Sequence, residues 1–166
     1  MDKEIKKYIN NQINYFKNNY GDSDYLINKD KLNITYKYGI YNNRYISLVL
    51  ITYISSYKLN QPIYDVKSYF YDIKEDKILY VTDILNKNNQ LILFNYIGNQ
   101  LKTNYYNYIV LDNIENIFNL EKLGTIPFFI TDNSIIIYFT PDSLASDYYD
   151  ILTIEIPISL IELNIW

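Results

Sequence analysis

The chain has 166 residues, a formal net charge of −4, and neither cysteine nor histidine. Its length is typical of one domain, so the sequence predicts a single domain over residues 1–166, with no internal repeat or linker. The missing cysteine and histidine exclude disulfides, thiol nucleophiles, Ser-His-Asp triads and histidine- or thiolate-bound metals. The acidic balance, without a basic stripe, argues against a nucleic-acid partner.

Membrane and targeting signals are also missing from the sequence as it stands. No apolar run reaches the roughly 18–20 residues needed to span a bilayer, and residues 1–11 lack the apolar core of a signal peptide. Tyrosine is unusually frequent, with 21 copies. Asparagine, isoleucine and lysine are frequent too, which is the codon bias of an AT-rich genome, so the tyrosine content alone does not indicate a sugar-binding surface.

The first half of the chain predicts one helix followed by strands. Residues 4–20 form the helix, because apolar residues recur there at spacings of three and four. Residues 31–40 alternate between apolar and polar side chains, which predicts a strand with one buried face. Asn42 and Asn43 suit a tight turn, and residues 44–57 form a long strand that is apolar on both faces in its middle, as in a central strand. Strands at residues 64–72 and 78–80 follow, joined by a charged turn.

The second half also begins with a long helix and ends in strands. Residues 89–104 predict a second long helix, in which Gly98 indicates close packing. A short helix is expected at residues 112–120. Three strands follow at residues 128–131, 134–140 and 151–156, and Asp132 and Asn133 form the turn between the first two through their tolerance of positive φ. The grouping predicts an α+β fold, with a mainly antiparallel sheet and two long helices packed on one face.

Two segments carry the candidate site residues. The loop after the predicted strand at residues 134–140 holds three carboxylates and two tyrosines, namely Asp142, Asp147, Tyr148, Tyr149 and Asp150. Paired carboxylates can perform acid–base chemistry, and oxygen clusters can hold calcium, but the spacing matches no calcium loop. Tyr57 lies at the predicted hairpin tip, where an exposed tyrosine could stack on sugar or anchor a protein partner. The alternative is a solvated acidic loop and ordinary half-buried sheet tyrosines. No catalytic residue, metal or cofactor is predicted.

The order of these parts resembles a known extracytoplasmic domain. It is found outside the membrane in RsiV-like anti-sigma factors, which sense lysozyme, and beside the catalytic domain of PdaC-like peptidoglycan deacetylases. The similar segments are EIKKYINNQINYFKNNY, ISLVLITYISSY with KSYFYDIKEDKILYVTDIL, and PFFITDNSIIIYFTPDSLASDYYDILTIEIPISLIEL. The chain departs from that family at residues 55–59, where a Gly-Gly-Ala-His segment is usual, and in the loop after Thr140 and Pro141.

The resemblance implies a non-catalytic binding or sensing module of the bacterial cell envelope. Its ligand would be a lysozyme-like protein or cell-wall glycan. An intracellular, immunity-like interaction domain and a carboxylate-based glycan hydrolase are the alternatives. The expected location is extracytoplasmic if the native chain carries an upstream signal or anchor, and cytoplasmic otherwise.

Overall fold

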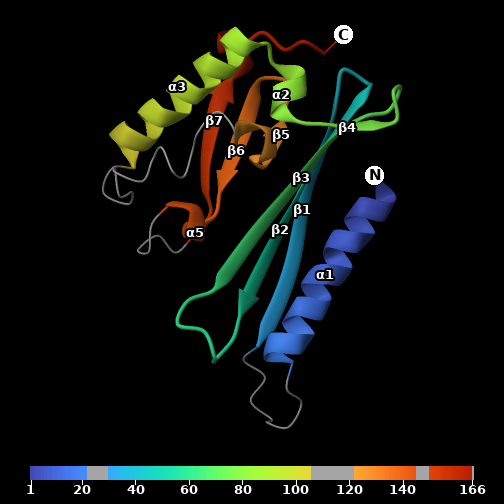
Figure 1. Ribbon diagram of the computed structural model, residues 1–166, viewed down its shortest axis with the longest axis vertical. Helices are drawn as coiled ribbons and strands as arrows, with labels where there is room; N and C mark the ends of the chain where they lie inside the picture. The colour runs from blue at the N-terminus through green and yellow to red at the C-terminus, as the bar shows by residue number, and fades with distance from the viewer. Residues whose placement is uncertain (22–29, 106–121, 145–149, 166) are drawn as a thin grey trace.

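The structure is a computed structural model that describes residues 1–21, 30–105, 122–144 and 150–165 (Figure 1). The expected helix at residues 112–120 lies outside these ranges. The described elements are the helices α1 (Asp2–Tyr20), α2 (Val81–Ile84), α3 (Lys87–Asn104) and α5 (Pro141–Leu144), the 3-10 helices η3 (Lys122–Thr125) and η4 (Ile158–Leu160), and the strands β1 (Lys31–Tyr41), β2 (Tyr45–Ser55), β3 (Ile63–Asp72), β4 (Lys77–Leu79), β5 (Phe128–Ile130), β6 (Ser134–Phe139) and β7 (Leu152–Pro157).

The strands form two antiparallel sheets. One has the order β1-β2-β3-β4 and the other the order β5-β6-β7. The α+β class, the antiparallel pairing and the central place of β2 are therefore confirmed. The division into two sheets was not predicted from the sequence.

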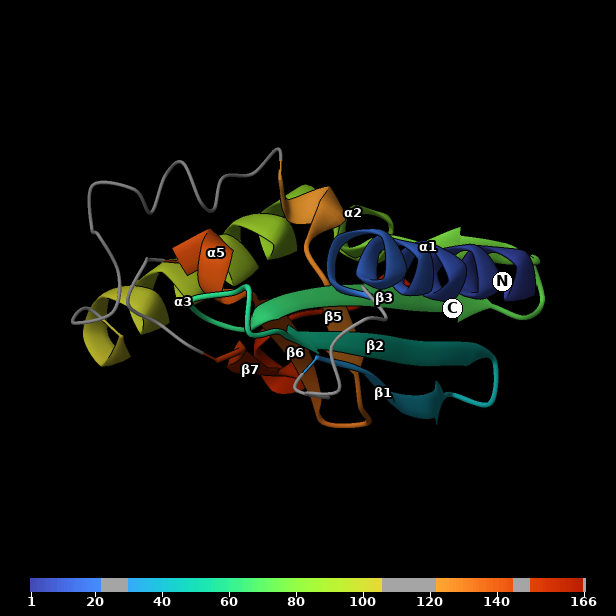
Figure 2. The same ribbon diagram turned by 90° about the horizontal axis from the view of Figure 1, so that it is seen from below.

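Each long helix packs on its own sheet. Helix α1 lies against the four-stranded sheet, and α3 lies against the three-stranded sheet at the opposite side of the molecule (Figures 1 and 2). The reason lies in β2, whose side chains are largely buried on both faces. On one face, Leu48 and Leu50 pack with Ile5 of α1, while on the other Val49 packs with Phe129 of β5. A strand with two apolar faces needs a cover on each of them.

Two serines join the sheets through the outer edge of β5. The Ile130 amide donates to the Ser47 hydroxyl at 2.9 Å, and the Phe128 amide donates to the Ser68 hydroxyl at 3.0 Å. The edge of the short strand β5 thus meets side chains from the face of the other sheet. Its backbone N–H groups are satisfied without a further strand.

The turns follow the sequence, with one difference in mechanism. Asn42 and Asn43 both adopt positive φ, at 50° and 52°, as expected for a tight hairpin turn. Asp132 and Asn133 also form a turn, but neither has positive φ. There the Thr131 hydroxyl accepts hydrogen bonds from the amides of Asn133 and Ser134, so a threonine side chain shapes the turn.

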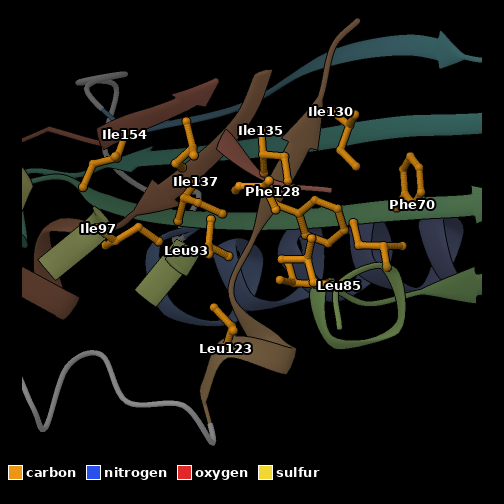
Figure 3. Packing of buried hydrophobic residues seen from close by; sticks show 14 of the residues in the cluster. Phe70, Leu85, Leu93, Ile97, Leu123, Phe128, Ile130, Ile135, Ile137 and Ile154 are labelled. Atoms are coloured by element: carbon orange, nitrogen blue, oxygen red, sulfur yellow. The ribbon is translucent and has the colours of Figure 1, made fainter. Parts of the chain in front are cut away.

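The main core lies between the three-stranded sheet and α3, and Figure 3 shows its packing. Leu93, Ile97 and Leu101 form the buried side of α3 at a spacing of four residues. Leu91 of the same helix is 49% exposed, although it is apolar. The prediction of close packing at Gly98 is wrong, because no described atom beyond the neighbouring residues and backbone of its own helix lies within 4 Å of the position that a Cβ would take.

The last described residues pack back on this core. The Asn89 side-chain amide donates to the Glu162 carbonyl at 2.7 Å, and the Asn164 amide donates to the Ile84 carbonyl at 2.8 Å. Leu163 forms an isolated antiparallel bridge with Leu85. Among the described helices, none is long and apolar enough to cross a membrane.

Candidate functional site

The β2–β3 hairpin exposes tyrosine at its tip. Tyr57 is 64% exposed, and the Lys58 ammonium lies 5.8 Å from the centre of its ring. The Tyr57 amide donates to Asp30 Oδ1 at 3.2 Å, which ties the tip to the residue just before β1. Tyr57 is therefore an aromatic side chain held on an anchored backbone and open to solvent, as the sequence predicts.

A pair of tyrosines lies just below the tip. Tyr53 and Tyr64 are paired across β2 and β3, and their rings meet edge to face with centres 5.3 Å apart. Burial raises the pKa of the Tyr64 hydroxyl, and the negative charge of Asp150 raises it further. Asp150 thus lies close enough to Tyr64 to act on it electrostatically, although the two are far apart in the sequence.

We call Tyr53, Tyr57, Tyr64 and Asp150 the tip surface. Asp150 is exposed, and its Oδ1 accepts a hydrogen bond from the Ile151 amide at 2.7 Å. Asp142 is exposed in α5, and no described contact joins it to Tyr57 or Asp150. The other predicted site residues, Asp147, Tyr148 and Tyr149, lie outside the described residues. The structure therefore places Asp150 within electrostatic range of Tyr64, and no described contact joins Asp142 to either residue.

A polar cluster between α1 and the sheet was not found from the sequence. The Tyr8 hydroxyl is 2.8 Å from the Thr52 hydroxyl and donates to Asp65 Oδ2 at 3.0 Å. The Gln12 amide donates to the same oxygen at 2.6 Å. Burial raises the pKa of the Tyr8 hydroxyl, and the Asp65 carboxylate raises it further, so Tyr8 stays protonated and remains a donor.

This cluster borders a cavity of about 460 Å³, within the size range of ligand pockets. Its lining is formed by Asn11, Gln12, Tyr15, Thr52, Ile54, Ile63 and Asp65. Amides and one carboxylate beside apolar walls can bind a small polar group. Carboxylate-based glycan hydrolysis uses two carboxyl groups about 5–10 Å apart, and Asp65 is the one carboxylate in this described lining.

The sequence signal for the cluster is weak but present. Thr52 and Asp65 interrupt the apolar pattern of their strands, and they are direct partners in the β2–β3 register. Two polar residues facing each other under a helix predict a hydrogen-bonding partner on that helix. The partner could be identified only after α1 had been placed on this face.

The wider site holds little that could bind a metal. Among the described residues, no group of three or more histidine, cysteine, aspartate or glutamate side chains could hold a metal ion. The described carboxylates instead make local contacts, such as the Arg44–Asp72 ion pair and the Asp65 cluster.

Several solved structures resemble the chain, including the following two. One is from Bacteroides fragilis, with 15% identity and a TM-score of 0.56, and the match covers 98% of this chain and 64% of that one. The other is from Pseudomonas aeruginosa, with 14% identity and a TM-score of 0.54, covering 89% of this chain and 65% of that one. Both are described as members of the DUF3298 family. At this identity the similarity concerns the fold.

The chain thus spans slightly less than two thirds of each of these solved chains. No curated protein matches it. Residues 82–159, from α2 into η4, match the model of a family described as "Protein of unknown function (DUF3298)".

Proposed function

We propose that the chain is a non-catalytic binding or sensing module of the bacterial cell envelope, and that its tip surface contacts a protein such as lysozyme. The observation that carries this proposal is the exposed ring of Tyr57, at the tip of the hairpin that also carries the Tyr53–Tyr64 pair. Tyrosine, with tryptophan and arginine, is enriched among the side chains that contribute most of the binding energy at protein interfaces. Cell-wall glycan is the second ligand to test, because tyrosine rings also stack on sugars.

Charge supports a basic partner. The chain carries a net charge of −4, and an acidic protein attracts a basic one over distances of about a Debye length. The resemblance to extracytoplasmic domains of RsiV-like and PdaC-like proteins supports an envelope location and a ligand met outside the cytoplasm. Fractionation of cells that express the native gene tests that location.

Calorimetry with lysozyme and with muropeptides tests the ligand. We expect lysozyme binding to weaken about tenfold or more in Tyr57→Ser, since loss of an interface anchor typically costs more than 1 kcal/mol. Asp150→Asn should weaken binding less, and most clearly at low salt. Tyr80→Ser is the matched control, because Tyr80 is 53% exposed at the start of α2.

A second basic protein of similar size separates specific recognition from simple charge attraction. If that protein binds as well as lysozyme, or if the folded chain binds neither lysozyme nor muropeptides, the proposal fails. Equal losses in Tyr57→Ser and Tyr80→Ser would also reject the tip surface as the site.

A further inference from the structure

Strand β1 is a long edge strand with an open outer side. It runs over 11 residues and pairs with β2 along its whole length, from Lys31 opposite Ser55 to Tyr41 opposite Tyr45. Within the described part of the chain, no hydrogen bond links its other edge to a further segment. The strand contains no proline, and its register with β2 is unbroken. Native proteins usually protect such an edge, since its unpaired backbone groups can accept another strand.

An exposed apolar row runs along one face of β1. Tyr36 is 66% exposed, Tyr38 is 68% exposed and Ile40 is 59% exposed, and the two tyrosine rings lie 6.3 Å apart. Among the described residues, no other strand exposes three large apolar side chains on one face. We call Tyr36, Tyr38 and Ile40 the β1 row.

The β1 row continues a buried layer. In the register, Tyr36 lies opposite Leu50 and Tyr38 lies opposite Leu48. Both leucines are buried in a cluster that Met1 and Ile5, at the start of α1, help to cover. Figure 2 shows α1 above β3, with β1 at the other side of the sheet. The covered layer therefore stops short of the β1 row, and apolar side chains added beyond β1 would extend it.

The other face of β1 is basic. Lys31 and Lys37 are exposed there, and β1 contains no acidic residue. This local charge is opposite in sign to the net charge of −4 of the chain. A second copy would bring two basic strands together, whereas an acidic strand would place carboxylates beside the lysines. Charge complementarity favours the acidic strand.

We propose that β1 is a docking strand for an extended acidic segment of a partner protein. The segment adds to the four-stranded sheet beside β1. Its backbone pairs with the open edge, its apolar side chains cover the β1 row, and its acidic side chains on the other face approach Lys31 and Lys37. In strand addition of this kind, backbone hydrogen bonds provide affinity and alternate side chains provide specificity.

A synthetic peptide tests the proposal directly. The probe is a capped nonapeptide that alternates glutamate with valine, carries a fluorophore and is read by anisotropy at low and physiological salt. One control peptide replaces glutamate with lysine. A second keeps the side chains but carries N-methyl groups on consecutive residues, which prevents strand pairing along both edges. We expect the glutamate peptide to bind best, and its binding to weaken as salt rises.

Three variants locate the binding. Tyr38→Ser and Lys37→Glu should each weaken binding of the glutamate peptide about fivefold or more, and Lys37→Glu should improve binding of the lysine peptide. Tyr80→Ser is the matched control, because Tyr80 is 53% exposed and lies just before α2, away from β1. All three positions are exposed, so the fold should be retained, and circular dichroism verifies this.

Several results would overturn the proposal. They are no binding of the glutamate peptide, equal binding of the N-methylated peptide, or an equal loss of binding in Tyr80→Ser. Sedimentation of the unliganded protein tests a further contradicting result. If the protein is a dimer and Tyr38→Ser dissociates it, a second copy occupies the edge of β1. A monomer that binds the glutamate peptide supports the acidic segment.

Discussion

Asp72 is an acidic residue whose side chain is only 3% exposed, and Arg44 makes its burial tolerable. Two guanidinium nitrogens of Arg44 donate to the two carboxylate oxygens, at 3.0 Å and 2.6 Å. The backbone amides of Lys74 and Glu75 donate to Oδ1 as well. The hydrogen bond from Arg44 lowers the pKa of Asp72 from 3.8 to about 2, and the backbone amides add to this effect.

This lowered pKa predicts a loss of stability in acid. Asp72 binds a proton more readily in the unfolded chain than in the folded one, so its stabilising effect is complete above pH 4 and is lost as the pH falls toward 2. We expect the urea midpoint of the natural protein to fall more steeply between pH 4 and 2 than that of Asp72→Asn. Parallel slopes for the two proteins in this range would contradict the prediction.

Replacing glycine with alanine should have opposite effects on stability at two positions. Gly98 has free space where a Cβ would be, so Gly98→Ala should stabilise the protein by about 0.5–1 kcal/mol through helix propensity and reduced chain entropy. At Gly21 a Cβ would lie 2.8 Å from the Lys17 carbonyl oxygen, so Gly21→Ala should destabilise it. Urea unfolding measures both, and two changes of the same sign would contradict this interpretation.

At Gly21, glycine is needed for a reason other than a left-handed helix cap. A glycine directly after a helix commonly forms a left-handed cap, but φ of Gly21 is −84°, outside the left-handed region. Glycine is needed because the backbone passes close to Lys17. Sequence patterns indicate that a position is special, whereas the contact that makes it special depends on the local path of the chain.

At the level of elements, the join between the sheets depends on two serines. Ser47 is fully buried, and its hydroxyl satisfies the Ile130 amide. Ser47→Ala would leave that amide buried without a partner and should cost about 1–3 kcal/mol, while Ser68→Ala should cost less because Ser68 is partly exposed. Ser55→Ala is the control, because no described hydrogen bond involves the Ser55 hydroxyl. Losses in free energy of unfolding that match the control would show that the serine bonds do not hold the sheets together.

The elements themselves could be predicted from the sequence, because their signals are local. Alternation defines β1, the apolar stripe defines α1, and Leu152, Ile154 and Ile156 are buried on one face of β7 as expected. The division into two sheets could not be predicted, since it depends on how the β5 edge meets Ser47 and Ser68. Tyr57 was predicted for the site from its place in a hairpin tip, but Tyr8 was missed, because its function depends on the contact with Thr52 and Asp65.

At the level of the whole molecule, one core reaches from the first sheet to α3. Tyr45 and Phe70 of the four-stranded sheet share a buried cluster with Phe128, Ile137 and α3. The Phe70 and Phe128 rings lie 5.9 Å apart, and Phe70 is 1% exposed. The two sheets therefore bury each other's apolar surface, so neither is expected to stay folded alone.

The single domain predicted from the sequence can be tested through this shared core. If both sheets belong to one cooperative unit, amides of β2 and of β6 should exchange with solvent at the same limiting free energy, and urea should give one transition by near- and far-ultraviolet circular dichroism. Phe70→Ala should lower the stability of both sheets together by about 3–5 kcal/mol, since it opens a cavity where they meet. Two separate transitions, or a loss confined to β1–β4, would show that the sheets fold independently and that the chain contains two units.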